Sequence, residues 1–193
     1  MKIETENSPT TGNFSELVRN RHSVRKFLPD TVEREKIVAC IEAARLAPSA
    51  ENVQPWRFVV LDEPDAIENF GASAFSGLYR FSRWAAQAPV IVAIFAELDW
   101  IANRLGKQIQ GTNYYLIDIG IAGEHIVLQA RELGLGSCWI GWFDAAKGAR
   151  ALNAPGKWKL AALLALGYPA GNQAKIKGKR SLEDILFFNG YKK

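Results

Sequence analysis

The sequence predicts an α+β domain in which several helices surround a small mixed sheet. Four apolar runs of strand type are separated by segments in which apolar residues recur at helical spacing. The chain has 193 residues, close to the roughly 150 residues typical of one domain, so a single domain is expected. We place this domain at residues 14–193 and interpret the polar residues 1–13 as a flexible N-terminal arm.

The composition is that of a globular chain with a substantial core. Hydrophobic residues make up 48% of the sequence and charged residues 23%, which excludes intrinsic disorder. The net charge of +4 suits an anionic small molecule as well as a nucleic acid. Because the basic residues are scattered and no nucleic-acid recognition motif is present, we expect no nucleic-acid partner.

The sequence contains no pattern typical of a membrane segment or of a disulfide framework. The longest apolar runs, APVIVAIFA and LAALLALGYP, are well short of the ~18 residues that a transmembrane helix needs. Cys40 and Cys138 lie in apolar stretches, where a thiol usually behaves as a small buried hydrophobe, and no CxxC metal motif occurs. We therefore expect a cytoplasmic protein with reduced cysteines, no bound metal and no membrane partner.

The first half of the domain is predicted to contain mostly helices. Apolar spacing predicts helices at residues 14–20 and 31–47, and Pro48 ends the second of them. The segment RFVVLDEP then predicts a strand closed by Pro64, and helical spacing returns over residues 66–86.

The second half begins with PVIVAIFA, a strand whose near-continuous apolar run predicts cover on both faces of the sheet. A long helix is expected at residues 112–133, ending in GLG as a helix C-cap often does. The runs SCWIG and LAALLALGYP predict two further strands on either side of a short helix at residues 144–152. The basic tail KIKGKRSLEDILF follows them.

The long helix is apolar around most of its circumference, as shown by Tyr114, Leu116, Ile117, Ile119, Ile121, Ile126, Val127, Leu128 and Leu133. A helix of this kind must be buried on most sides. It is either an ordinary central core helix or part of a subunit interface, where Gly120 and Gly123 would allow close approach of a second helix. We favour the interface of a homodimer, since most soluble oligomers are symmetric.

The motifs of a protein-borne nucleophile are missing from the sequence. His22 and His125 are far apart, and there is no GxSxG, Walker or GxGxxG pattern. We therefore assign no catalytic residue, and interpret His125 as a polar position on the long helix.

One candidate binding segment is residues 21–25, Arg-His-Ser-Val-Arg, which we call the strip. In an extended chain alternate side chains point the same way, so Arg21, Ser23 and Arg25 would share one face. Two guanidinium groups and a hydroxyl suit a phosphate, because arginine binds phosphate oxygens in pairs. Taken alone, such a run is more often a solvated basic turn.

Two further segments have the composition of ligand-binding loops. Residues 48–56, Pro-Ser-Ala-Glu-Asn-Val-Gln-Pro-Trp, form a rigid polar loop before a tryptophan, which suits a planar heterocycle or caps the core. Residues 134–141, Gly-Leu-Gly-Ser-Cys-Trp-Ile-Gly, have glycines that permit close backbone approach to a ligand or simply form turns.

Taken together in this order, the three segments resemble the FMN-dependent nitroreductase family, whose members carry an R-[RH]-S-x-R strip, a PSxxNxQPW loop and a GLGxxW segment after a long helix. The resemblance extends from about Phe14 to Ile185. It implies a nitroreductase-like fold with a mainly antiparallel sheet, and a homodimer with the long central helix at its interface. It also implies two FMN sites, each built from both chains.

The resemblance further implies which residues bind FMN. The phosphate and ribityl end would be held by Arg21, His22, Ser23 and Arg25. The flavin would be reached from the partner chain by Pro48, Ser49 and Asn52, and the backbone N–H of Gly141 would lie near flavin N5. Arg83 resembles the family's cation at the pyrimidine edge, and the tail that returns to the phosphate resembles Lys177, Lys179 and Arg180.

The implied activity is the transfer of two electrons from NAD(P)H to an oxidised acceptor, such as a nitroaromatic or a quinone, by a ping-pong mechanism in which the flavin performs the chemistry. One alternative is a non-enzymatic flavin-binding or storage protein. Another is a specialised enzyme of the same fold, of the reductive dehalogenase or flavin-fragmenting type. Residues 98–111 are the candidate cover of the site, with Trp100 and Trp142 available to flank the ring.

Overall fold

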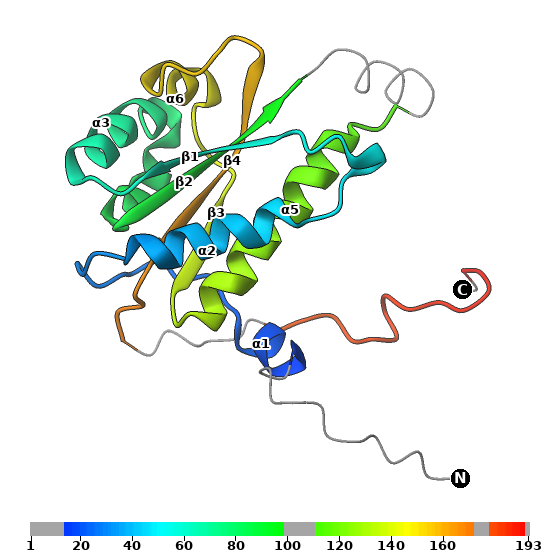
Figure 1. Ribbon diagram of the computed structural model, residues 1–193. Coiled ribbons are helices and arrows are strands. Elements are labelled where there is room, and N and C mark those ends of the chain that lie inside the picture. The colour runs from blue at the N-terminus through cyan, green and yellow to red at the C-terminus, as the bar shows by residue number, and fades with distance from the viewer. Residues whose placement is uncertain (1–13, 99–110, 172–177, 192–193) are drawn as a thin grey trace.

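The computed structural model describes residues 14–98, 111–171 and 178–191 (Figure 1). The helices are α1 (Phe14–Asn20), α2 (Arg34–Arg45), α3 (Pro64–Ala74), α5 (Tyr114–Glu132) and α6 (Ala145–Ala151), together with the 3₁₀ helices η1 (Ala50–Asn52) and η2 (Gly77–Gln87). The strands are β1 (Trp56–Leu61), β2 (Val90–Glu97), β3 (Gly136–Ile140) and β4 (Trp158–Gly167). The expected arm at residues 1–13 lies outside the described residues.

The four strands form one sheet in the order β1-β2-β4-β3, and every neighbouring pair is antiparallel. The register pairs Val59 with Ala93, Ala93 with Leu163, and Cys138 with Ala165. A parallel pairing is also present, as an isolated bridge between Ser23 and Ser137. This bridge attaches the strip to the outer edge of β3.

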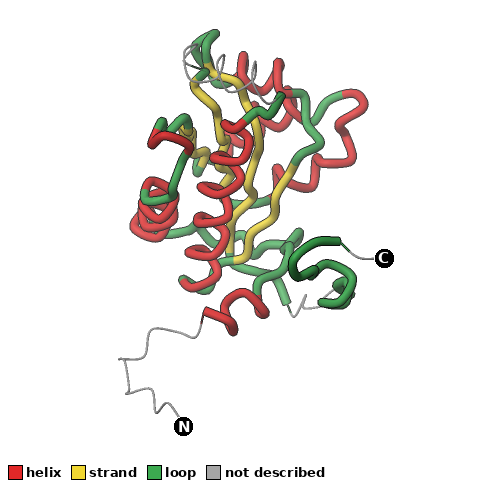
Figure 2. Tube along the Cα trace, turned by 90° about the vertical axis from the view of Figure 1, so that its right-hand side faces the viewer, coloured by secondary structure: helices red, strands yellow, loops and turns green. Residues whose placement is uncertain are grey.

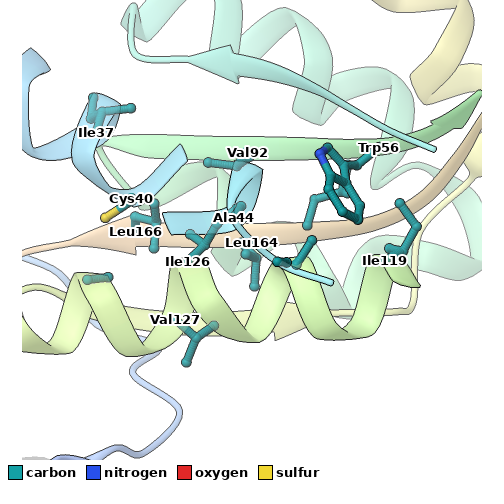
Figure 3. Packing of buried hydrophobic residues seen from close by; sticks show 14 of the residues in the cluster. Ile37, Cys40, Ala44, Trp56, Val92, Ile119, Ile126, Val127, Leu164 and Leu166 are labelled. Atoms are coloured by element: carbon teal, nitrogen blue, oxygen red, sulfur yellow. The ribbon is translucent and has the colours of Figure 1, made fainter. Parts of the chain in front are cut away.

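Helices cover both faces of the sheet, so the molecule has three layers (Figures 1 and 2). On one face, Val92 and Leu164 pack with residues of α2 and α5 such as Cys40 and Ile126 (Figure 3). On the other face, alternate strand residues such as Phe95 pack with α3, η2 and α6. β2 is buried from both sides, and the predicted cover on both faces of this strand is confirmed.

The observed elements follow the predicted ones closely, and residues 66–86 add a detail that the sequence did not predict. The sequence predicts helical structure there, and the chain forms two helical segments, α3 and then η2. Ser76 adopts an extended backbone and Gly77 has a φ of +58°, which ends the α-helical hydrogen bonding between the two segments. The predicted helical character of residues 66–86 is therefore confirmed, and Gly77 changes the direction of the chain between the two helical segments.

Helix α5 is buried on two sides and exposed on a third. It packs against α2 and against the sheet, and Ile119 and Ile126 are in the core. Leu116 and Ile117, however, are 46% and 50% exposed. The helices that the structure describes include none that is long and apolar enough to cross a membrane.

Candidate functional site

The strip runs alongside β3 in an extended conformation. The backbone N–H of Val24 donates to the carbonyl of Ser137 at 2.9 Å. Val24 points into the core and is 2% exposed, whereas Ser23 and Arg25 are exposed on the outer side. The strip therefore presents a hydroxyl and a guanidinium group together, as the extended spacing predicts.

His22 contributes a polar atom without a partner. Its Nδ1 lies 3.1 Å from the carbonyl oxygen of Asn20. Its Nε2 is buried and makes no hydrogen bond with any group in the described part of the chain. A buried polar atom of this kind costs free energy unless something bonds to it. Because Nδ1 donates to a carbonyl, Nε2 is the acceptor of the neutral ring, and a ligand hydroxyl beside the strip would meet this need.

Arg21 is held from the side by helix α5. Its Nε lies 3.7 Å from Oε1 of Glu124, and the indole N–H of Trp139 on β3 donates to Oε2 of the same carboxylate at 3.2 Å. Arg21 therefore pairs with α5 through Glu124, and Glu124 is in turn bonded to Trp139 on β3.

Helix η2, which carries Arg83, contacts the strip through Trp84. The guanidinium carbon of Arg25 lies 5.9 Å from the ring centre of Trp84, the residue after Arg83. Arg83 is exposed on η2, where it lines a cavity of about 750 Å³ that Trp84, Pro29 and other residues also border. The residue after the predicted cation therefore contacts the strip.

The loop at residues 48–54 has a strained backbone held by local hydrogen bonds. Glu51, Asn52 and Gln54 all have positive φ angles, of 51°, 57° and 49°, which residues other than glycine rarely adopt. Ser49 Oγ accepts the backbone N–H of Gln54 at 3.0 Å, and Gln54 Nε2 donates to Asn52 Oδ1 at 3.1 Å. Such strain is typical of a loop shaped for a ligand or a partner.

This loop and the strip contact different parts of α5 (Figure 1). The backbone N–H of Ala50 donates to Oδ1 of Asp118 at 3.0 Å, whereas Arg21 pairs with Glu124, six residues further along the helix. At ~1.5 Å per residue these attachment points are about 9 Å apart along the axis. One chain thus does not bring Pro48, Ser49 and Asn52 together with the strip.

Gly141 follows the last residue of β3 and is exposed, and a β-carbon there would meet nothing within 4 Å. The next residue, Trp142, is exposed but anchored: its indole N–H donates to the carbonyl of Leu78 at 3.1 Å, and its ring lies 5.3 Å from that of Tyr79. The backbone at Gly141 is therefore accessible beside a fixed aromatic ring.

The remaining predicted residues belong to the tail and to the candidate cover. Lys179 and Arg180 are exposed, and no described group forms a hydrogen bond or ion pair with either side chain. Lys177, Trp100 and residues 99–110 lie outside the described residues.

Two residues that matter to the site geometry were missed by the sequence analysis. Asp118 is buried and holds the 48–54 loop, and Glu124 holds Arg21. The available signal was the presence of these carboxylates inside an otherwise apolar helix, where a charge needs a partner.

The chain matches the model of the nitroreductase family over residues 18–168, a range that contains the strip, the loop and β3. It therefore belongs to the nitroreductase family. A protein of Methanothermobacter thermautotrophicus, provisionally named NADH dehydrogenase/NAD(P)H nitroreductase, is 29% identical over 88% of this chain and 82% of its own length. The 5,6-dimethylbenzimidazole synthase of Rhodospirillum rubrum is 30% identical over 77% and 78% of the two chains.

Among solved structures, an FMN-dependent nitroreductase of Clostridium difficile is similar, with a TM-score of 0.69. The two chains are 26% identical, and the match covers 91% of this chain and 98% of the other. The α+β architecture with an antiparallel sheet is accordingly that of the nitroreductase fold.

The strip has a donor set that fits a phosphate-bearing cofactor. Arg21 and Arg25 supply cations, Ser23 a hydroxyl, and His22 an unpartnered ring nitrogen. Phosphate oxygens accept from the guanidinium groups and the hydroxyl. Because Nδ1 of His22 donates to the carbonyl of Asn20, Nε2 of the neutral ring is an acceptor for a ligand hydroxyl.

Proposed function

We propose that this protein is an FMN-dependent oxidoreductase that passes two electrons from NAD(P)H to an oxidised acceptor such as a nitroaromatic or a quinone. The observation that carries the proposal is the strip itself, a donor-rich segment seated on β3 with the unpartnered Nε2 of His22. Membership of the nitroreductase family and the similarity to an FMN-dependent nitroreductase support it.

In this proposal each segment holds one part of FMN. Arg21 and Ser23 hold the phosphate, and His22 and Arg25 the ribityl end, with help from the tail residues Lys177, Lys179 and Arg180. Arg83 stands at the pyrimidine edge, and the backbone N–H of Gly141 donates near flavin N5. The cavity beside Arg83 and the open backbone at Gly141 are compatible with these placements.

Bound FMN supplies hydride acceptance and two-electron donation, which explains why the chain needs no nucleophile of its own. The residues of the protein orient the flavin and supply charges that stabilise its reduced form. Arg25, which lies over Trp84, and Arg83, the residue before Trp84, would stabilise the negative charge that accompanies reduction. NAD(P)H and the oxidised acceptor would use the same face of the flavin in turn, since we propose one flavin site and no separate nucleophile.

The site would be completed by a second copy of the chain, which would contribute Pro48, Ser49 and Asn52. The exposed apolar side chains support a homodimer. Leu116 and Ile117 are exposed on α5, and large apolar residues are exposed along the tail at Leu182, Ile185, Leu186, Phe187 and Phe188. Apolar surface of this extent usually marks a protein interface.

Kinetics of the FMN-loaded protein test the oxidoreductase activity. We expect NADH or NADPH alone to bleach the flavin under anaerobic conditions, and parallel double-reciprocal lines when donor and acceptor are varied. Intersecting lines would contradict the ping-pong mechanism. If a chemical reductant bleaches the flavin but neither NADH nor NADPH does, the proposed oxidoreductase activity is contradicted. That result would favour a flavin-storage protein.

Ligand binding tests the phosphate assignment separately. Arg21→Ala and Ser23→Ala should both weaken FMN binding, and the arginine should cost more, because a charge-assisted hydrogen bond is worth about 1.5–3 kcal/mol. Riboflavin, which lacks the phosphate, is the control ligand. Equal losses for FMN and riboflavin would show that the strip does not bind the phosphate.

A flavin-fragmenting activity is a second candidate, which the similarity to 5,6-dimethylbenzimidazole synthase favours. Incubation with FMN, NADPH and oxygen followed by mass spectrometry separates the two activities. Recovery of intact FMN supports the electron-transfer activity. The appearance of 5,6-dimethylbenzimidazole would show flavin fragmentation and would contradict the electron-transfer proposal.

A further inference from the structure

Glu124 lies between two donors that come from different elements. Arg21 of the strip approaches Oε1 at 3.7 Å, and the indole N–H of Trp139 on β3 donates to Oε2 at 3.2 Å. Glu124 itself belongs to α5. The carboxylate thus connects the helix, the sheet and the strip at one point, and each of its oxygens faces a different donor.

The Trp139 side of this arrangement is rigid. A β-carbon on Gly123 would lie 2.1 Å from the Trp139 ring, so the indole packs directly against the backbone of α5, one residue before Glu124. Close packing of this kind leaves the ring little room to move. The indole N–H therefore fixes the carboxylate independently of the strip.

The Arg21 side has a geometric consequence for ligand binding. A guanidinium group is planar and carries donors on its Nε and on both terminal nitrogens. The contact with Glu124 is at Nε and so does not use the two terminal nitrogens, which are able to bind a phosphate in parallel. Attachment at Nε also restricts a side chain that would otherwise sample many rotamers.

We propose that Glu124 is a positioning residue for the phosphate subsite, and that it acts through Arg21 by turning the terminal nitrogens of the guanidinium toward the ligand. This inference rests on the proposed function, in which Arg21 binds the phosphate of FMN. The charge of Glu124 opposes that of the phosphate, but the carboxylate side chain is 45% exposed, so solvent screens the repulsion. The benefit of orienting the Arg21 guanidinium therefore outweighs the repulsion between Glu124 and the phosphate.

Titration of the apoprotein with FMN and with riboflavin tests the inference. Glu124→Ala should weaken FMN binding about five-fold, as expected for a partly exposed ion pair, and should leave riboflavin binding within two-fold of the unchanged protein. Glu124→Gln should recover most of the loss, since the amide keeps an oxygen acceptor. Glu132→Ala, which removes an exposed carboxylate from the same helix, is the matched control and should change neither affinity.

A double-mutant cycle separates action through Arg21 from a direct effect. In the Arg21→Ala background, Glu124→Ala should cause no further loss of FMN affinity. If Glu124→Ala fails to fold, Trp139→Phe is used instead, because this substitution removes the indole donor while keeping an aromatic ring. Trp139→Phe should weaken FMN binding more than riboflavin binding.

Several outcomes would overturn the inference: unchanged or tighter FMN binding by Glu124→Ala, equal losses for both ligands, or a further loss in the Arg21→Ala background. Failure of the proposed function looks different. If Arg21→Ala itself does not distinguish FMN from riboflavin, the phosphate assignment fails. If Arg21→Ala weakens FMN binding more than riboflavin binding and Glu124→Ala changes neither affinity, only the role of Glu124 is refuted.

Discussion

Gly136 and Val24 are in a contact that no larger residue at position 136 would permit. A β-carbon built on Gly136 would lie 2.7 Å from Cγ2 and 2.9 Å from Cβ of Val24. Val24 is the buried residue of the strip, and its backbone N–H bonds to the residue after Gly136. The missing side chain at position 136 therefore sets how closely the strip sits against β3.

Gly136→Ala should push Val24 outward and move the strip with it. We expect a loss of about 1–3 kcal/mol in the free energy of unfolding, as for other overpacked cores, and weaker FMN binding. Gly156→Ala is the control, because a β-carbon at that turn meets nothing within 4 Å. Denaturant unfolding and FMN titration measure the two effects, and FMN affinity equal to that of the unchanged protein would contradict this account of the strip.

Asp118→Ala should release the 48–54 loop from α5, because the buried carboxylate accepts the backbone N–H of Ala50. The variant loses a part-buried hydrogen bond to a charged group, worth about 1.5–3 kcal/mol, so it should unfold at lower denaturant concentration. If this loop contacts the flavin ring, FMN and riboflavin should be weakened equally, in contrast to Arg21→Ala. Asp118→Asn keeps an oxygen acceptor and should be milder, and a loss confined to FMN would contradict a contact between the loop and the ring.

Ile117→Glu tests the homodimer. Ile117 is 50% exposed in a single chain, so a charge there should leave the fold intact while disrupting a subunit contact. Ile121, one turn further, packs partly against the core and is less suitable. Light scattering should show monomers that retain little FMN, whereas Ala146→Glu, on exposed α6 in the other layer, should remain dimeric. An FMN-loaded Ile117→Glu dimer would argue against this interface.

The cysteines should be unreactive in the folded protein. Burial raises the pKa of the Cys40 thiol to about 11, and burial is also the main cause that raises the pKa of Cys138. At pH 8 only about one Cys40 in a thousand would be a thiolate, the form that reacts with disulfide reagents. Reaction with such a reagent should be slow at pH 8, faster as the pH rises toward 11, and complete for both thiols after unfolding. Rapid native labelling would contradict the burial of these residues.

Much of the fold could be predicted because apolar periodicity reports directly which side of an element is buried. The bounds of α1 agree with the prediction, and α5 and the four strands agree to within about two residues. The break after α3 escaped prediction, because helical spacing continues across Ser76 and Gly77 and only the backbone angle shows the change in direction.

The residues around the site were less predictable, since their roles depend on which elements pack together. The strip and its alternation could be predicted from local sequence, and the buried Val24 between the exposed Ser23 and Arg25 agrees with that alternation. Asp118 and Glu124 acquire their roles from partners at Ala50 and Arg21, which are distant in the chain. No local pattern encodes such pairs, whereas the packing of α5 against its neighbours creates them.

The attachment of the strip also has a consequence for the order of events during protein synthesis. Ser23 bridges Ser137, and Phe27 bridges Pro169, so residues near the start of the domain pair with residues more than a hundred positions later. The strip is therefore made early by the ribosome but has no place to dock until almost the whole domain has emerged. Helix α2 and the first hairpin of β1 and β2 can form before that. The edge of the sheet that carries the strip is thus assembled last, and a chain truncated before residue 169 would lack the bridge from Phe27 to Pro169.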